Sequence, residues 1–196
     1  MKAGKSSFLV TEVRRPEHES ALVVGHSWDT RFDSHDVVQS LSTHDGICTP
    51  CQRGASWMDL HRLLQESENP SPIRVLFVDE CQFFHLASKH PSEELQQLLE
   101  ECRSRGVEKV FMAGLNRDWR GDPFEWIAAA TAIAKAETLP LTHSRLYATC
   151  EQCGCVRASR SHLKQDPQGS RVHVGAGDMY LALCKSCFCE MKKNAP

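Results

Sequence analysis

The stretch VLFVDECQFF, residues 75–84, decides how this chain should fold. With the two residues before it, the stretch makes a nearly continuous apolar run up to Asp79, which is typical of a parallel strand covered on both faces. The run ends in two acids, Asp79 and Glu80, and adjacent residues of a strand point to opposite sides. One acid can therefore serve a metal ion while the other faces a substrate as a base. The plainer alternative is a solvated strand end.

A second short stretch, Gly4-Lys5-Ser6, bears directly on function. These are the last three residues of the phosphate-binding pattern G-x-x-x-x-G-K-[ST], and they open a helical segment, where free N–H groups favour phosphate. Lys5 would reach the β- and γ-phosphates of a nucleotide, and Ser6 would hold Mg²⁺, which an acid at a strand end binds through water. A match of three residues also occurs as an inert turn. The first glycine and the strand of a complete loop would precede Met1, so we expect an N-terminally truncated chain.

The chain up to about residue 140 alternates between helical and strand-like segments. We expect helices at 6–15, 57–65, from Ser92 to Gly106 and at 123–137, and strands at 21–25, 73–79 and 107–113. Residues 29–54 are polar without a sustained period and are expected to be mostly loop. From Tyr147 onward, paired cysteines, basic residues and glycines replace this alternation. The pattern predicts an α/β fold with an open parallel sheet in residues 1–146 and a small zinc-binding lobe in residues 147–196.

Composition narrows the class of protein further. The formal net charge of -2 over 196 residues excludes a broadly basic nucleic-acid binder, although it does not exclude a local basic patch. No apolar run approaches the roughly 20 residues that a membrane-spanning helix needs. Ten cysteines is a high count, but secreted disulfide scaffolds are usually shorter than about 80 residues. Cysteines arranged as C-x-x-C pairs favour a metal site in a reducing compartment, so we expect a cytoplasmic protein.

Two of these pairs, Cys150-x-x-Cys153 and Cys184-x-x-Cys187, have the spacing of a tetrahedral Cys₄ zinc site. Because four thiolates leave no position for water, this zinc should be structural. Cys155 and Cys189 flank the quartet, and the C-x-x-C spacing excludes them. A third pair, Cys48 and Cys51, has no partner pair and is interpreted as two ordinary loop thiols. Cys81 and Cys102 have the setting of core residues.

Six motifs, taken in order from Met1 to about residue 188, resemble those of the type II thymidine kinases, which are zinc-containing deoxynucleoside kinases with a phosphate loop. The matching stretches are MKAGKSS at 1–7, DTRF at 29–32, STHDG at 42–46, DECQFF at 79–84, GLNRDWRGDPF at 114–124 and VGAGDMY at 174–180, and one cysteine pair lies on each side of the last of them. The resemblance implies a RecA-like core, a zinc lobe with a lasso-like lid, and usually a homotetramer. It implies transfer of a phosphoryl group from ATP, with transient Mg²⁺, to the 5′-hydroxyl of thymidine. It implies neither a membrane partner nor a nucleic-acid partner.

The resemblance also assigns roles by position. It implies that Glu80 is the general base and that the zinc ligands are the four cysteines of the two pairs. The residues implied to serve ATP and Mg²⁺ are Gly4, Lys5, Ser6, Ser7, Asp29, Arg31, Asp79 and Gln82. Those implied to bind the nucleoside are Leu115, Trp119, Val172, His173, Val174, Gly175 and Tyr180. Trp119 stands where the family has a phenylalanine stacked on the base, and Arg160 and His162 also differ from the common residues, so nucleoside selectivity does not follow from the resemblance.

Two other classes of function compete with a thymidine kinase. A truncated copy could be catalytically weak or inactive and act as an interaction subunit of a mixed oligomer. Alternatively, the chain could be a phosphate-loop ATPase whose zinc ribbon binds nucleic acid, which would need basic and aromatic side chains around the zinc. Residues 157–164 supply Arg157, Arg160 and Lys164 but no aromatic side chain, so nucleic acid is the less favoured partner.

Overall fold

The computed structural model describes residues 2–29, 39–43, 46–66, 72–84, 88–135, 144–164 and 179–193. The chain divides into two compact units. The core unit comprises Ser6–Gly114 and Glu125–Thr142, and the cysteine unit comprises Met1–Lys5, Leu115–Phe124 and His143–Pro196. The sequence-based limits of 1–146 and 147–196 remain predictions.

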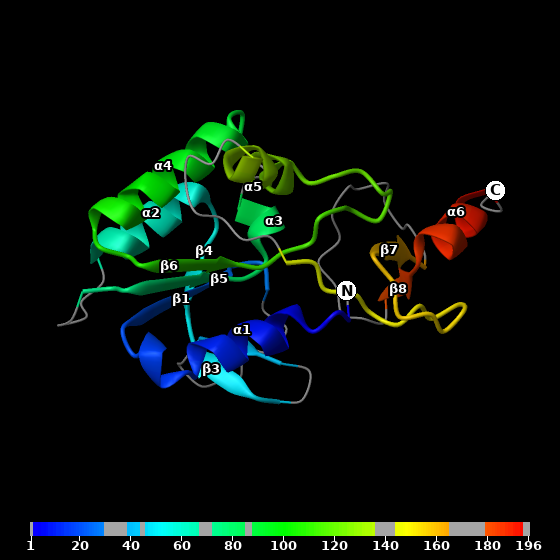
Figure 1. The fold of residues 1–196 in the computed structure, drawn as a ribbon, viewed down its shortest axis with the longest axis horizontal. Coiled ribbons are helices and arrows are strands. Elements are labelled where there is room, and N and C mark those ends of the chain that lie inside the picture. The colour runs from blue at the N-terminus through cyan, green and yellow to red at the C-terminus, as the bar shows by residue number, and fades with distance from the viewer. Residues whose placement is uncertain are drawn as a thin grey trace. The chain divides into compact units, whose positions relative to one another are not determined.

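The core unit is built on a four-stranded parallel sheet with the order β4-β1-β5-β6 (Figure 1). The strands are β1 (Ala21–His26), β4 (Gln52–Gly54), β5 (Val75–Val78) and β6 (Lys109–Met112). In register, Val24 lies beside Val78, and Val78 lies beside Met112. The carboxyl ends of β1, β5 and β6 therefore meet at one edge, where ligands bind in open α/β sheets. The prediction of an α/β fold with a parallel sheet is confirmed.

Helices cover both faces of this sheet, which explains why β5 is buried along its whole length. Figure 1 shows α1 (Lys5–Val13) on one side and α2 (Trp57–Glu66) and α4 (Pro91–Ser104) on the other. Leu9 and Val10 of α1 pack with Val75 and Phe77 of β5 in one buried cluster. On the other side α4 contacts both α2 and α5 (Glu125–Lys135). A short 3₁₀ turn, Pro16–His18, links α1 to β1.

Parts of the predicted arrangement are wrong. Within the described part of residues 29–54, the chain forms three short strands, β2 (Ser40–Ser42), β3 (Cys48–Pro50) and β4, and β4 extends the central sheet beside β1. Three residues are too few to show a period of two, so the sequence reads as loop. Ser92, interpreted from the sequence as the N-cap of the next helix, lies inside it: the helix begins at Pro91, a residue type favoured in the first helical turn, and has His90 as its N-cap.

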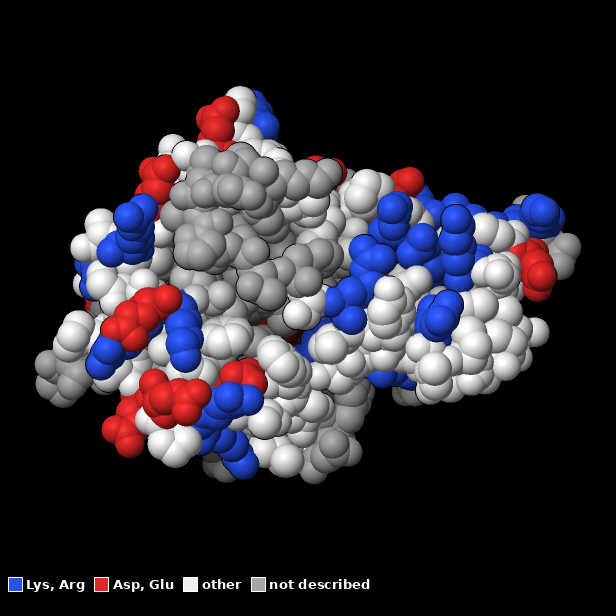
Figure 2. Space-filling view, in the orientation of Figure 1, with Lys and Arg blue, Asp and Glu red and all other residues white. Residues whose placement is uncertain are grey.

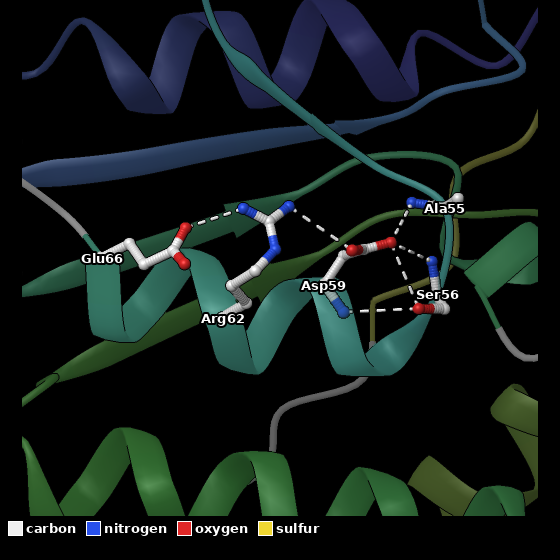
Figure 3. Close-up of polar contacts among 5 residues, drawn as sticks. All are labelled: Ala55, Ser56, Asp59, Arg62 and Glu66. Atoms are coloured by element: carbon white, nitrogen blue, oxygen red, sulfur yellow. Dashed lines mark hydrogen bonds and ion pairs between the residues drawn. The ribbon is translucent and has the colours of Figure 1, made fainter.

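The amino end of α2 shows how local sequence fixes an element of the core unit (Figure 3). Ser56 precedes the helix, and the backbone N–H of Asp59 donates to its Oγ at 3.3 Å. Asp59 Oδ2 in return accepts from the backbone N–H groups of Ala55 at 2.8 Å and Ser56 at 3.1 Å. This reciprocal arrangement is a capping box, which satisfies donors that the first helical turn leaves without partners.

The cysteine unit has a separate and smaller core. Its β7 (Arg160–Leu163) and β8 (Tyr180–Leu183) pair antiparallel, and α6 (Lys185–Lys193) follows β8 directly. The buried residues of this core are Ala148, Cys150, Ala158, Ala182, Leu183, Cys187 and Phe188. The described residues thus form a small apolar core, and a core of that size provides little folding free energy without a metal or disulfides. All ten cysteines of the chain are free thiols.

No helix among the described residues combines the length and the apolar character that crossing a membrane requires.

Candidate functional site

The two stretches that the sequence singled out meet at the carboxyl edge of the sheet. Ser6, in the first turn of α1, donates a hydrogen bond from Oγ to Oδ2 of Asp79 at 2.9 Å, across 73 positions of sequence. Asp79 follows the last residue of β5 and is only 1% exposed. Gly4, just before the helix, has φ of +73°, a left-handed conformation that glycine adopts without strain. The hydroxyl and carboxylate expected to share a metal ion are thus neighbours.

Glu80 lies in an uncommon backbone conformation, with φ of +54°. Its N–H donates to Oδ1 of the preceding Asp79 at 2.9 Å, and Gln82 Nε2 donates to its Oε2. A left-handed non-glycine residue costs on the order of 1 kcal/mol or more and is found disproportionately at functional sites. The turn gives the two adjacent carboxylates different partners, Ser6 for one and Gln82 for the other. That separation permits the division of work that the sequence suggested.

The short helix α3 (Cys81–Phe84), which the sequence did not predict, holds Gln82 in place. The Cys81 N–H donates to Ala113 O at 2.9 Å, so α3 is seated on the end of β6. Gly114 follows that strand, and a Cβ there would lie 2.6 Å from Oε1 of Gln82 and 2.9 Å from the Trp126 ring. Both distances are too short for real atoms, so the absence of a side chain at 114 is what allows Gln82 to reach Glu80.

His26 is a member of this edge that sequence reasoning missed. It ends β1, is 1% exposed, and its ring packs edge-on against Phe84 at 4.8 Å between centroids. Nδ1 accepts from the Trp28 N–H at 3.1 Å, and Nε2 donates to Ala55 O at 3.2 Å. Burial lowers the pKa of His26, so the ring stays neutral near pH 7. Its position as the last residue of an apolar strand was the available signal.

Other predicted site residues lie in different settings. Asp29 is buried just beyond β1, and its N–H donates to His26 O at 3.0 Å. Ser7 lies in the first turn of α1 and accepts through its backbone oxygen from Thr11. Arg31 and the stretch Val172, His173, Val174 and Gly175 lie outside the described residues, so their expected roles remain predictions.

Within the cysteine unit, a tight turn presents Trp119. Asp118, 3% exposed, accepts through Oδ1 from the N–H groups of Arg120 at 3.0 Å and Asp122 at 2.8 Å. The Arg120 guanidinium lies 4.9 Å from the centroid of the Trp119 ring, a cation–π contact. Leu115 opens this segment half-buried, and Tyr180 is buried at the start of β8. The buried carboxylate thus fixes the backbone that carries the tryptophan.

The cysteine unit also contains a group of sulfur atoms suited to a metal ion. The Sγ atoms of Cys150, Cys153, Cys155 and Cys184 all lie within 4.8 Å of one another, and Cys153 and Cys184 are 3.9 Å apart. A tetrahedral zinc ion with Zn–S bonds of about 2.3 Å requires sulfur atoms roughly 3.8 Å apart, so these residues fit zinc. Burial opposes ionisation of Cys150, but the N–H groups of Cys184, Cys153 and Gln152 outweigh it and lower the pKa of Cys150 to about 6. A thiolate is the form that binds zinc.

This group differs by one residue from the predicted quartet. Three predicted ligands belong to it, but its fourth member is Cys155, which the spacing rule had excluded. Cys187 is buried in the same small core, and the neighbouring Cys184 thiol and burial raise its pKa. Cys189 is exposed on α6 and belongs to no such group. The part of the chain that the structure describes holds no second group of this kind, and there Cys48 contacts the Ser42 hydroxyl.

A parallel sheet whose carboxyl edge joins a Gly-Lys-Ser helix start to a buried strand-end acid is typical of α/β proteins of the phosphate-loop class. A family model described as thymidine kinase matches residues 1–188, and the chain belongs to the thymidine kinase family. The match includes the strand edge and the cysteine pairs, so both sites described above lie within the part shared with the family.

Proposed function

We propose that this chain transfers the γ-phosphoryl group of ATP to the 5′-oxygen of thymidine, as part of nucleotide salvage. The observation that carries the proposal is the Ser6–Asp79 hydrogen bond beside Glu80, at the carboxyl edge of the sheet. Phosphoryl transfer needs positioning and neutralisation of charge more than covalent chemistry, and this edge offers both. Membership of a kinase family supports the same reaction.

The residues divide the work as follows. Lys5 and the free N–H groups at the start of α1 bind the β- and γ-phosphates. Ser6 and Asp79 would hold Mg²⁺, which neutralises charge on the phosphates when it is bound. Glu80 accepts the proton of the 5′-hydroxyl, and Gln82 orients the Glu80 carboxylate by donating to one of its oxygens. Because His26 is neutral, it places no positive charge at this edge that could neutralise the Glu80 carboxylate.

We assign the binding of the nucleoside base to residues of the cysteine unit. Trp119 offers a flat ring held by Arg120, which suits stacking against a pyrimidine. Leu115, Tyr180 and the backbone of 172–175 complete this assignment by family resemblance. A homotetramer follows from the same resemblance and is part of the proposal, as are a cytoplasmic location and a structural zinc ion, which the cysteine pairs favour.

The experiment is ADP release measured with and without thymidine. A kinase releases ADP only when a nucleoside accepts the phosphoryl group, so the rate should rise steeply on adding thymidine and little on adding cytidine. ADP release that is independent of any nucleoside would instead favour a plain ATPase. No turnover with any nucleoside, although ATP binds, would favour the inactive-copy alternative.

One observation favours a second candidate, a nucleic-acid-binding role of the cysteine unit. This unit carries twelve Lys and Arg against six Asp and Glu, whereas the core unit carries eleven against nineteen. Figure 2 shows Lys and Arg side chains gathered on the surface of the cysteine unit. Burial and the charges of Arg117 and Arg145 lower the pKa of Arg160, and no ion pair joins any of the three to a described carboxylate. Such segregated charge attracts phosphate backbones.

A gel-shift titration with single-stranded DNA shows whether the chain binds nucleic acid in addition to any kinase activity. Replacing Arg145 and Arg160 with alanine should weaken binding and reduce its salt dependence, whereas Arg62→Ala, on α2 of the core unit, should not. An absence of binding at moderate salt would remove the second candidate without affecting the first.

A further inference from the structure

Three elements of the cysteine unit meet at the ring of Phe188, which lies on α6 and is 5% exposed. The His162 ring, on β7, packs edge-on against it at 6.2 Å between centroids. On the turn that carries Trp119, a Cβ at Gly121 would lie 3.2 Å from the Phe188 ring, so the turn backbone also lies against it. Lys192, about one helical turn after Phe188, has its Nζ 5.5 Å from the ring centroid. The phenylalanine therefore fixes where β7, α6 and the turn come together.

This arrangement brings two cations to neighbouring positions of the turn. Lys192 Nζ donates a hydrogen bond to Arg120 O, which ties the end of α6 to the turn. Arg117 donates from Nη1 to Gly121 O at 2.7 Å, so its guanidinium lies across the same turn. Neither Lys192 nor Arg117 forms an ion pair with a described carboxylate. Backbone oxygens thus hold both charges in place, without an acidic partner among the described residues.

The half-buried face of β7 adds a third cation. Arg160 and His162 are two positions apart, so they share a face of the strand, and both are half-buried whereas the residue between them is buried. The Arg160 guanidinium donates through Nη1 to Ser159 O at 3.1 Å, and its other N–H groups bind no described residue. Arg145 lies on the segment that pairs antiparallel with the residues before β7. Burial, followed by the charges of Arg117 and Arg145, lowers the pKa of Arg160, as expected where like charges lie close together.

His162 provides a second and independent observation. Its Nδ1 is buried and forms no hydrogen bond with any described residue. Native proteins rarely leave a buried polar atom without a partner, so each such atom needs an explanation, for example a bound ligand. Burial and the charge of Lys192 lower the pKa of His162, so the ring is neutral near pH 7 and lies close to the ammonium group. An imidazole nitrogen that lacks a partner therefore stands among cations that lack acidic partners.

We propose that these side chains form a binding site for an anion with linked phosphate groups, such as a diphosphate. The residues of the site are Arg117, Arg145, Arg160, His162 and Lys192. Guanidinium groups fit phosphate oxygens through paired N–H groups, and a neutral imidazole donates one further hydrogen bond. Four cations carry more charge than a single phosphate group neutralises, which favours linked phosphates. This inference concerns the cysteine unit alone and does not depend on the kinase proposal.

The first test is calorimetric titration of the zinc-loaded chain with pyrophosphate, in a Lys5→Ala background that weakens binding at the start of α1. One pyrophosphate should still bind per chain. Adding Arg160→Ala or Lys192→Ala should weaken this binding by at least about tenfold, the loss expected for one hydrogen bond to a charged group. Lys193→Ala is the matched control, because it removes the same charge from the next residue of α6, and it should bind like the background variant. No binding in the Lys5→Ala background, or equal weakening by Lys192→Ala and Lys193→Ala, would overturn the proposal.

A second test uses the unaltered chain and so does not depend on the folding of any variant. Pyrophosphate should slow hydrogen exchange of the amides in residues 117–122 and in β7, besides any effect at the start of α1. Equal protection by ADP would show that a free diphosphate suffices, whereas stronger protection by ADP would show that the site takes a nucleotide. Protection confined to the start of α1 would contradict the proposal. Binding of single-stranded DNA that pyrophosphate does not displace would also contradict it, and would assign the cations to nucleic acid.

Discussion

The strand edge of the core unit and the sulfur site of the cysteine unit are built in opposite ways. At the strand edge, the backbone is held by α1 and by the buried strand β5. Ser6, Asp79 and Glu80 lie at the ends of these elements, and the burial of β5 does not depend on their side chains. At the sulfur site the surrounding core is small, and short turns bring the thiols together. We therefore expect the first site to keep its fold when a functional side chain is lost, and the second to depend on its thiols and a bound metal for its fold. Each prediction below tests that difference.

Removal of the metal should have the largest effect. Structural zinc provides an apparent free energy on the order of 10 kcal/mol in small domains, more than the apolar core of the cysteine unit can replace. A chelator, or Cys150→Ser, should expose the amides of β7 and β8 to hydrogen exchange while those of β5 stay protected. Protection of β7 and β8 that persists without metal would show that the unit is stabilised by packing, and the contrast between the two regions would disappear.

Glu80→Gln should abolish most activity and leave the fold intact. Loss of a general base costs roughly 10²–10⁴-fold in rate, because the amide can still bind Gln82 but cannot take the proton. ATP affinity and the melting temperature should change little. Glu93→Gln, an exposed acid in the first turn of α4, is the matched control and should behave like the parent chain. Turnover near the parent value in Glu80→Gln would remove Glu80 from the mechanism.

Gly114→Ala should show how closely the core unit supports its site. The new Cβ would meet Gln82 and Trp126 at distances that real atoms do not adopt, so Gln82 must move away from Glu80. Overpacking of this kind costs about 1–3 kcal/mol of stability, and kcat should fall with it because Glu80 loses its orienting partner. The measurement is denaturant unfolding alongside steady-state kinetics. Unchanged stability with unchanged kcat would mean that the close approach at 114 is not required.

The capping box of α2 should give the smallest effect. Asp59→Asn or Ser56→Ala should lower the free energy of unfolding by about 1 kcal/mol. The Ala55 N–H holds the pKa of Asp59 below its ordinary value of 3.8, so its contribution is present above that pH and is lost as the pH falls through the folded-state pKa. Asp59→Asn should therefore remove this part of the decrease in the free energy of unfolding at low pH. Glu66→Gln, which removes the charge of the exposed pair with Arg62 seen in Figure 3, is the control and should change stability less than either cap variant, because water screens exposed pairs.

The parts predicted well from sequence are those where burial or long periodicity leaves a strong pattern. VLFV could be recognised because both faces of β5 are covered, and α2 because its apolar residues recur at helical spacing. The pairing of β4 with β1 could not be predicted, because three residues carry no period. The left-handed turn at Glu80 was also missed, since glutamate does not indicate a positive φ.

The sulfur site marks the limit of arguments from spacing. The C-x-x-C rule identified Cys150, Cys153 and Cys184, because short spacings place thiols on one turn. It excluded Cys155, whose Sγ reaches the group only through the turn at Gly154. His26 was missed although it ends an apolar strand, because that position alone does not show which strands lie beside β1 at the edge.

The most direct test of the proposed chemistry is to follow the γ-phosphoryl group itself. ATP labelled at the γ-phosphate is incubated with Mg²⁺, thymidine and the zinc-loaded chain, and the labelled product is identified by chromatography and NMR. The account predicts label on the 5′-oxygen of thymidine with the parent chain and with Glu93→Gln, and almost none with Glu80→Gln. Label released only as inorganic phosphate, or transfer that is equal with Glu80→Gln, would contradict it.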